Sequence, residues 1–254
     1  MNSEIFKEIN QHGPNWGKLH NGYFADAVTA APLIDEIKSA VNLSNPKIII
    51  DLAGGTGFIL SELIKSGISP AVRLINLDLS IKQLDNLKEN RIQTICSSLP
   101  DFKRCDIGIE SEMFFIMRSA LHYFGHDGLE PLLRHLRQQM KAGEFFVHQN
   151  PCFENQADAD CVNKIYKMMG TGKWYPTVEY LSELLEKTGF EIESISPAPK
   201  LPLTSCDLAQ RYSLTGKNIS DIRSQSANID NIFNLTENGF CAYLHYKIFT
   251  CIAV

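Results

Sequence analysis

A short apolar run followed by a glycine-rich turn, at residues 48–57, constrains the fold more than any other part of this chain. Three isoleucines lead into Asp51, and the turn after it holds the glycines Gly54, Gly55 and Gly57. A continuous apolar run of this length is typical of a strand buried in a parallel sheet. Glycines allow a tight turn that approaches a ligand closely. A helix is expected to follow at 58–65, and helix N-termini bind small anions such as carboxylates.

Strand-like and helix-like patterns alternate along most of the chain. Apolar runs predict strands at 47–52, 72–77, 92–96, 112–117, 144–148, 190–195 and 242–253. Helical patterns predict helices at 58–65, 81–89, 129–140, 157–169 and 178–187, the last with Thr177 as its cap. Such alternation is typical of the α/β class, with a doubly wound sheet that is mostly parallel. We therefore expect a Rossmann-like sheet of seven strands.

Two segments fall outside this alternation. Residues 1–46 have near-helical spacing and many aromatic side chains, and we expect them to form a helical N-terminal lid segment. Residues from about 196 to 239 contain prolines and then a Ser/Asn-rich stretch, which predicts an insertion with one or two helices before the last strand. The main domain is accordingly expected at 47–254.

Charge and hydropathy exclude several classes of partner. The net charge is −5 and no long Lys/Arg block occurs, so we expect no nucleic-acid partner. No apolar run approaches the ~18 residues of a membrane span, so we expect no membrane partner. The first residues are polar and acidic and show no signal peptide, which favours a cytoplasmic protein. The sequence leaves open whether the protein forms a homodimer.

The cysteine pattern predicts reduced thiols. The seven cysteines include no Cys-x-x-Cys pair, as expected for mostly buried free thiols. The alternative is a soft-metal or arsenic site made of Cys152, Cys161 and Cys206. Nothing in their spacing supports such a site, and we expect no metal.

A second acidic residue narrows the ligand of the glycine turn. Asp78 ends the second predicted strand, where an acid can accept hydrogen bonds from both ribose hydroxyls. A dinucleotide fingerprint, Gly-x-Gly-x-x-Gly, is the rival, but its third glycine position is occupied by Leu60. Asp51 would also repel a pyrophosphate, whereas it suits an ammonium group. A ribose, a carboxylate and an ammonium group occur together in S-adenosylmethionine.

These motifs resemble those of a known family. The segment Asp51-Leu-Ala-Gly-Gly-Thr-Gly57 closely resembles the first motif of class I S-adenosylmethionine-dependent methyltransferases, and Leu77-Asp78-Leu79-Ser80 is similar to the second. The stretch from Met117 to Phe124, with Met140-Lys-Ala-Gly143 after it, is similar to the fourth-strand region of small-molecule members. The resemblance covers roughly residues 45–195 and the last strand, and it implies a methyltransferase domain.

The resemblance also implies roles for individual residues in cofactor binding. Asp51 and the backbone of Ala53, Gly54 and Gly55, in the turn closed by Gly57, would hold the methionine end of the cofactor. Asp78 would bind the ribose, and Leu79 would pack on the adenine. Ser97 and Ser98 would flank the adenine, at a place where members of the family often carry an acid. Arg118 and Ser119 would border the sulfonium.

Methyl transfer to a hydroxyl suggests a catalytic base and a segment of the chain that covers the substrate. A hydroxyl nucleophile needs a base, and His148 and His122 follow the fifth and fourth strands, at the sheet edge where ligands bind. A structural role is the alternative for both histidines. In the family the substrate is covered by segments outside the core. The candidates for substrate contact there are Tyr23, Trp174, Tyr175, Arg211 and Tyr212.

The sequence thus predicts an S-adenosylmethionine-dependent methyltransferase that acts on a small organic acceptor, with oxygen favoured over nitrogen or carbon. A nucleic-acid methyltransferase is one rival, although Arg118-Ser-Ala-Leu stands where such enzymes often carry an Asn/Asp-Pro-Pro-Tyr motif. A protein that binds the cofactor without transferring a methyl group is a second rival. A nicotinamide oxidoreductase is the third.

Overall fold

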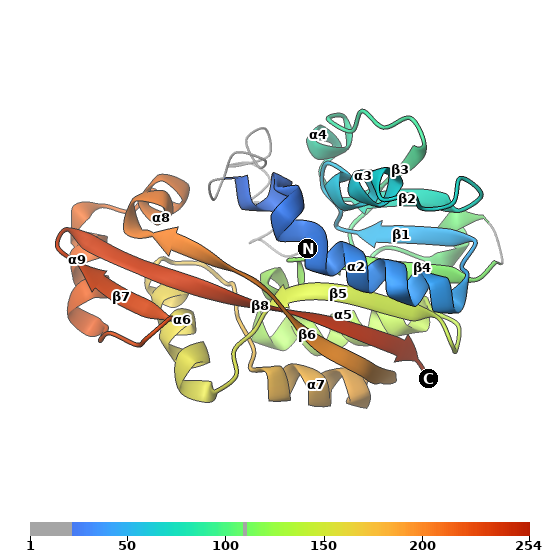
Figure 1. Cartoon of the computed structure of the whole chain (residues 1–254). Coiled ribbons are helices and arrows are strands. Elements are labelled where there is room, and N and C mark those ends of the chain that lie inside the picture. The colour runs from blue at the N-terminus through green and yellow to red at the C-terminus, as the bar shows by residue number, and fades with distance from the viewer. Residues whose placement is uncertain (1–21, 109–110) are drawn as a thin grey trace.

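The computed structural model describes residues 22–108 and 111–254, which form one mixed sheet with helices on both faces (Figure 1). The strand order is β3-β2-β1-β4-β5-β8-β6, with β7 paired to β8. The strands are β1 (Ile48–Leu52), β2 (Arg73–Asp78), β3 (Ile92–Cys96), β4 (Met113–Arg118), β5 (Phe145–Pro151), β6 (Phe190–Thr204), β7 (Phe233–Thr236) and β8 (Gly239–Ala253). The α-helices are α2 (Ala27–Ser44), α3 (Phe58–Lys65), α4 (Ile81–Leu84), α5 (Gly125–Gln138), α6 (Gln156–Met168), α7 (Val178–Lys187), α8 (Ser205–Tyr212) and α9 (Gly216–Gln225).

The middle of the sheet is parallel and contains the point where the strand order reverses. Strand β1 pairs in parallel with β2 on one side and β4 on the other, and Asp51 lies in register with Asn76 of β2. Strand β8 is antiparallel to both β5 and β6. In open sheets of this kind, ligands bind outside the carboxyl ends of the strands at the reversal point. The topology therefore directs attention to the ends of β1, β2 and β4.

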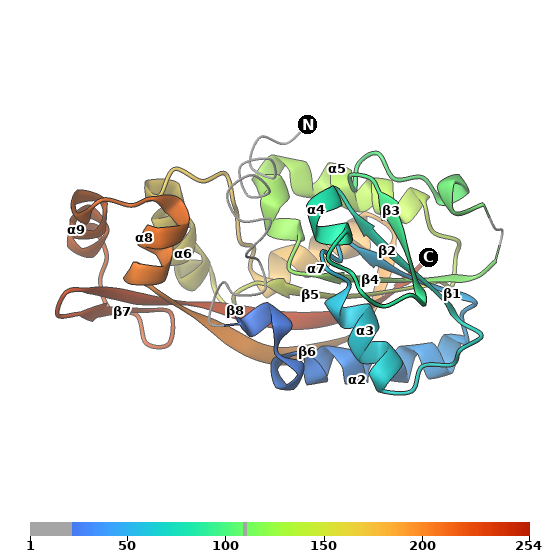
Figure 2. The same ribbon diagram turned by 90° about the horizontal axis from the view of Figure 1, so that it is seen from above.

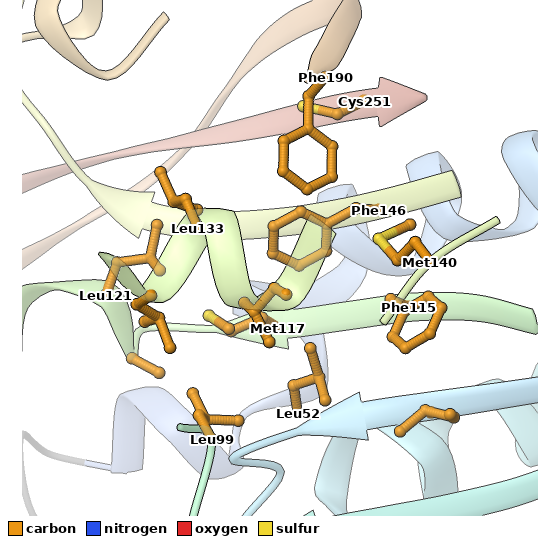
Figure 3. Close-up of a cluster of buried hydrophobic side chains, with 14 of the residues drawn as sticks. Leu52, Leu99, Phe115, Met117, Leu121, Leu133, Met140, Phe146, Phe190 and Cys251 are labelled. Atoms are coloured by element: carbon orange, nitrogen blue, oxygen red, sulfur yellow. The ribbon is translucent and has the colours of Figure 1, made fainter. Parts of the chain in front are cut away.

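Each face of the sheet carries its own hydrophobic layer. Helices α2 and α3 cover one face and α5 and α7 cover the other, which the view from above shows clearly (Figure 2). Figure 3 shows Leu52, Met117 and Phe146, from three neighbouring strands, directed into the same space as Leu133 of α5. Because both faces are buried, the central strands need the continuous apolar sequence found in β1.

A second hydrophobic cluster lies beyond the end of this core. Strands β6 and β8 run on past the central sheet and, with β7, pack against α6, α8 and α9 (Figure 1). Large buried side chains of this cluster include Phe153, Tyr166, Tyr175, Phe233 and Phe240. The segment predicted as an insertion thus forms a small packed unit with the far ends of two sheet strands.

The predicted fold class is confirmed, with one additional strand. Short β7, within the predicted insertion, makes the sheet eight-stranded. Helix α7 has the predicted bounds, and Thr177 Oγ1 accepts the backbone N–H of Tyr180 at 3.1 Å as its cap. No helix among the described residues has the length and apolar character needed to cross a membrane.

Three elements end three or more residues away from their predicted ends. Helix α4 stops at Leu84, after which Leu87 packs beside the glycine turn. Strand β5 continues to Pro151, three residues beyond the predicted end at His148. Strand β6 continues to Thr204 despite three prolines. Those prolines are tolerated because β6 is an edge strand that pairs only with β8, so a missing N–H can face away from the ladder.

The described part of the predicted N-terminal lid has two parts. Helix α2 packs against the sheet through Ala30, Leu33 and Ile37, so it is a layer of the fold. A 3-10 turn at 22–25 precedes it and brings Phe24 to a cavity at the sheet edge. Residues 1–21 of the predicted lid lie outside the described residues.

Candidate functional site

A cavity, here called the cleft, opens at the carboxyl ends of β1, β2 and β4. The predicted cofactor-binding residues that line it are Asp51, Ala53, Gly54, Gly55, Asp78, Leu79, Ser97, Ser98, Arg118 and Ser119. Gly57 does not line it. Gly57 caps α3 with a φ of 74°, and a Cβ there would lie 2.5 Å from Leu87 Cδ1. Gly57 therefore closes the turn beside the cleft.

Two side chains of β2 hold the glycine turn through hydrogen bonds. Asn76 Nδ2 donates to the Gly55 carbonyl at 2.9 Å, and the Gly55 N–H donates to Asp78 Oδ2 at 2.9 Å. A Cβ on Gly54 would lie 2.1 Å from Asn76 Oδ1 and 2.5 Å from Asp51 Cγ, so only glycine fits there. Asn76 was not predicted as a site residue, although a polar residue inside a buried apolar strand is a signal that could have indicated it.

Asp51 is an unsatisfied buried acid. The residue is 1% exposed, and neither carboxylate oxygen has a hydrogen-bond partner among the described residues. Burial, with a smaller contribution from nearby Asp78, raises the pKa of Asp51 to about 8. A buried carboxylate is costly unless a cation or donors compensate it. A positively charged ligand group bound in the cleft would therefore stabilise the Asp51 carboxylate.

Arg118 is the cation of the cleft, and it ties the N-terminal turn to the sheet. Its Nη1 donates to the Phe24 carbonyl at 3.3 Å and its Nη2 to the Tyr23 carbonyl at 3.4 Å. The guanidinium also lies over both rings, 5.4 Å from the Phe24 centroid and 5.5 Å from that of Tyr23. Burial lowers the pKa of Arg118, while Tyr23, Tyr246 and Asp51 favour its charged form.

Asp78 is both structural and exposed to the cleft. Besides Gly55, it accepts the Ser80 N–H at 2.7 Å. Burial raises the pKa of Asp78, and these hydrogen bonds oppose that rise. Gln83 of α4 also lines the cleft, and its Oε1 has no partner among the described residues. Gln83 was missed because a glutamine on an amphipathic turn carries no distinctive sequence signal.

A second, smaller cavity, here called the inner chamber, adjoins the cleft. The two share Phe24, Ser119 and Tyr123. The remaining residues of its lining are His122, Tyr166, Lys173, Tyr175, Leu201, Arg211, Leu244 and Tyr246. They come from the segment after β4, from α6, from the loop before α7 and from the second hydrophobic cluster. The inner chamber therefore lies between the central sheet and the predicted insertion.

Some of the predicted substrate residues line the inner chamber, and the others pack behind its wall or elsewhere. Tyr175 and Arg211 line the inner chamber. Tyr23 lines neither cavity, because its hydroxyl is turned to the Pro199 carbonyl and to Gln149. Trp174 also lines neither, because its ring packs on His126 and on Tyr180 of α7, with centroids 4.9 and 5.1 Å away. Tyr212 supports the wall, since its hydroxyl accepts Lys173 Nζ at 2.6 Å.

The two predicted base residues differ in position. His122 lies in the 3-10 helix η3 (Leu121–Phe124) and lines the inner chamber, with its ring stacked on Tyr175 at 5.2 Å. His148 is fully buried between Phe146 and Phe249 and lines none of these cavities. Burial lowers its pKa to about 3. Because β5 continues past it, His148 lies inside the sheet, and its assignment as a base is withdrawn.

No group of three or more His, Cys, Asp or Glu side chains is arranged to hold a metal ion within residues 22–108 and 111–254.

Comparisons with known proteins support an assignment of the fold. No family model matches the chain. The chain is similar to 3-amino-4-hydroxybenzoate 4-O-methyltransferase of Streptomyces cremeus, with 23% identity over 207 residues, which cover 78% of this chain and 54% of the relative. It thus spans about half the length of that curated relative.

Two solved structures of other methyltransferases show the same architecture. One is 1,6-didemethyltoxoflavin-N1-methyltransferase of Burkholderia thailandensis, with bound S-adenosylhomocysteine, which has a TM-score of 0.56, 13% identity and coverage of 98% of this chain and 88% of that one. The other is magnesium protoporphyrin IX methyltransferase of Synechocystis, with a TM-score of 0.57, 11% identity and coverage of 98% and 95%. This chain has the Rossmann-like fold of class I S-adenosylmethionine-dependent methyltransferases, as the sequence resemblance implied.

Proposed function

We propose that this protein transfers a methyl group from S-adenosylmethionine to an oxygen atom of a small organic acceptor. The cofactor would bind in the cleft, with the acceptor beside its methyl group. The fold, the similarity to an O-methyltransferase and the charged residues of the cleft support this proposal. A small acceptor fits better than a nucleic acid because the net charge is −5 and the sequence contains no long Lys/Arg block.

The observation that carries the proposal is the pair of opposite charges buried in one cleft. Asp51, without a partner among the described residues, suits the ammonium of the methionine end. Arg118 suits the carboxylate of that same end. We place Arg118 there, and no longer beside the sulfonium, because two cations in contact repel each other. Asp78, at the next strand end, is left for the ribose.

The reaction needs alignment and the removal of one proton. When bound, S-adenosylmethionine supplies an electrophilic methyl group, and the acceptor oxygen forms the new C–O bond as the C–S bond breaks and its electrons stay on sulfur. Holding the acceptor oxygen in line with the C–S bond can supply much of the rate enhancement. His122 closely follows Ser119 and Ala120, which line the cleft, and we assign it as the base that takes the hydroxyl proton.

Replacement of Asp78 by alanine is expected to weaken cofactor binding by ~1–3 kcal/mol, the cost of a lost hydrogen bond to a charged group. The loss also frees the Gly55 N–H that holds the glycine turn. Titration calorimetry with S-adenosylhomocysteine measures the effect. Asp85→Ala is the matched control, because Asp85 is exposed on the same segment. Wild-type affinity in Asp78→Ala would contradict the ribose assignment.

The affinity for S-adenosylhomocysteine is expected to fall as the pH is lowered from 8 to 6. Burial raises the pKa of Asp51 to about 8, so below that pH the carboxyl is protonated and must lose its proton to bind an ammonium group. Each pH unit below 8 then weakens binding by up to about tenfold. Calorimetry in buffers of different ionisation enthalpy should detect close to one proton released per ligand at pH 6. A constant affinity between pH 6 and 8 would argue against an ammonium group at Asp51.

A further inference from the structure

Three buried oxygen atoms on neighbouring strands accept no hydrogen bond. They are the two carboxylate oxygens of Asp51 and Oδ1 of Asn76, and none of them has a partner among the described residues. Asp51 is 1% exposed and Asn76 is 0% exposed, and the two residues lie in register on β1 and β2. A buried acceptor without a donor is costly and rare, so a hydrogen atom that serves this group of oxygens is expected.

The Gly55 carbonyl fixes the orientation of the Asn76 amide. Asn76 Nδ2 donates to that carbonyl at 2.9 Å. The reversed amide would lose this hydrogen bond and bring Oδ1, an acceptor, against the carbonyl oxygen. The other side of the Asn76 amide therefore presents its oxygen and offers no donor to the Asp51 carboxylate.

The oxygens of Asp51 and Asn76 converge at Gly54. A Cβ on Gly54 would lie 2.1 Å from Asn76 Oδ1 and 2.6 Å from Asp51 Oδ2, so these two oxygens are separated by no more than the sum of those distances. A position too crowded for a carbon atom has no room for a bridging water. Asp51 lines the cleft and Asn76 does not, so a ligand in the cleft reaches Asp51 only. The donor for Asn76 Oδ1 must then come from Asp51 itself.

We propose that Asp51 of the ligand-free protein is a neutral acid whose O–H donates to Asn76 Oδ1. Asn76 is then a positioning residue that acts through Asp51, because a hydrogen bond to the neutral form of an acid favours that form. Resting on the proposed function, the ammonium group of the cofactor displaces this proton. The O–H bond of the carboxyl group breaks, the proton leaves to solvent, and an ammonium N–H donates to the carboxylate that remains.

The charged groups around Asp51 act separately from this hydrogen bond. Burial and the charge of Asp78 on β2 oppose ionisation of Asp51, and Arg118 on β4 favours it. The glycine turn, residues 53–57, is the third element against Asp51 and carries no titratable side chain. The contribution of Asn76 can therefore be measured by replacing Asn76 while these charges are kept.

Infrared spectroscopy of the ligand-free protein tests the neutral acid directly. We expect a C=O stretch of a protonated carboxyl group at pH 7 that disappears as the pH is raised to 9.5 and is missing in Asp51→Asn. Absence of this band from the wild-type spectrum would overturn the proposal, whatever the affinity for the cofactor. Presence of the band in a protein that fails to bind S-adenosylhomocysteine would support the hydrogen-bonded acid and overturn the proposed function.

Asn76→Leu tests the role of Asn76, because leucine has nearly the same shape and no acceptor. The C=O stretch should move to higher frequency, and the pH at which S-adenosylhomocysteine affinity falls should drop by about one pH unit. The ratio of the affinities at pH 8 and pH 6 then decreases about fivefold. Asn150→Leu is the matched control, since Asn150 is a buried strand asparagine that accepts the Leu121 N–H, and it should keep the wild-type ratio. A wild-type ratio and band position in Asn76→Leu would refute the positioning role.

Methylthioadenosine tests whether the ammonium group displaces the proton. This compound shares the adenosine and the sulfur of S-adenosylhomocysteine but has neither the ammonium nor the carboxylate group. Calorimetry should show no proton release on its binding and an affinity constant within twofold between pH 6 and pH 8. Proton release equal to that of S-adenosylhomocysteine would overturn the displacement step and leave the infrared result to decide the neutral acid.

Discussion

Replacing Asp51 by asparagine is expected to weaken binding of S-adenosylmethionine and S-adenosylhomocysteine by about 2–4 kcal/mol, roughly 30- to 1000-fold. The carboxylate is fully buried and has no partner among the described residues, so its charge is available for a ligand cation. Asparagine is nearly the same size but neutral. It would leave the ligand ammonium in a buried site without an opposite charge.

The same substitution is expected to stabilise the ligand-free protein. Burial raises the pKa of Asp51 to about 8, so above that pH the folded protein carries an uncompensated charge that the unfolded chain hydrates freely. Asparagine removes this cost. The gain in thermal midpoint over the wild type should therefore grow as the pH rises from about 4, near the ordinary pKa of an aspartate, to about 8, and stay constant above that.

Calorimetry and thermal unfolding together check both halves of this prediction. Asp101→Asn is the matched control, because Asp101 is an exposed acid that accepts a hydrogen bond from Ser98 at the edge of the cleft. It should change neither quantity appreciably. Full cofactor affinity in Asp51→Asn would remove Asp51 from the binding site, whereas loss of affinity with loss of stability would indicate a structural role.

The second large expected effect is a loss of folding stability, caused by a substitution near the amino-terminal ends of β4 and β5. Arg104 forms a two-pronged ion pair with Glu144, with N–O distances of 2.7 and 2.8 Å, and Glu144 is 5% exposed. The Glu144 carboxylate also accepts the Met113 N–H at 2.7 Å at the start of β4. Glu144→Ala would leave the Met113 N–H without its acceptor and the Arg104 guanidinium without its opposite charge, with only the Ser111 and Gln139 carbonyls as partners. A loss of about 3–5 kcal/mol in the free energy of unfolding is expected.

Urea unfolding measures this loss, and a double variant tests its cause. Replacing both charged partners, as Arg104→Met with Glu144→Leu, should recover part of the lost stability, because no buried charge then remains unpaired while the Met113 N–H still lacks its acceptor. S-adenosylhomocysteine affinity, measured well below the unfolding midpoint, should stay near the wild-type value in either variant. A loss below about 1 kcal/mol in Glu144→Ala would show that solvent replaces the lost contacts.

The cofactor half of the site could be predicted because it depends on local sequence. The apolar run before Asp51 determines where β1 ends, and the glycines after it determine the turn. The spacing to Asp78 follows from one strand–helix–strand unit. Since parallel strands end at a common edge, residues far apart in the sequence could be placed together without knowing any long-range contact.

The acceptor half could not be predicted in the same way. Whether His148 faces the site depends on where β5 ends, and its antiparallel partner β8 carries the strand three residues further than local pattern suggests. The Ser119–Tyr246 contact joins residues 127 positions apart. Trp174 is aromatic and near the chamber in sequence, but its packing on α7 turns it away. Tertiary packing, and not local sequence, determines where these strands end and where these side chains point.

The central claim is that the ends of β1 and β2 bind opposite ends of S-adenosylmethionine. Titration of the purified protein with S-adenosylhomocysteine, and separately with NAD, tests it most directly. We predict saturable binding of S-adenosylhomocysteine at one site per chain, weakened at least about 30-fold in Asp51→Asn, and no measurable binding of NAD. Binding of NAD in place of S-adenosylhomocysteine, or binding of neither compound, would contradict the claim.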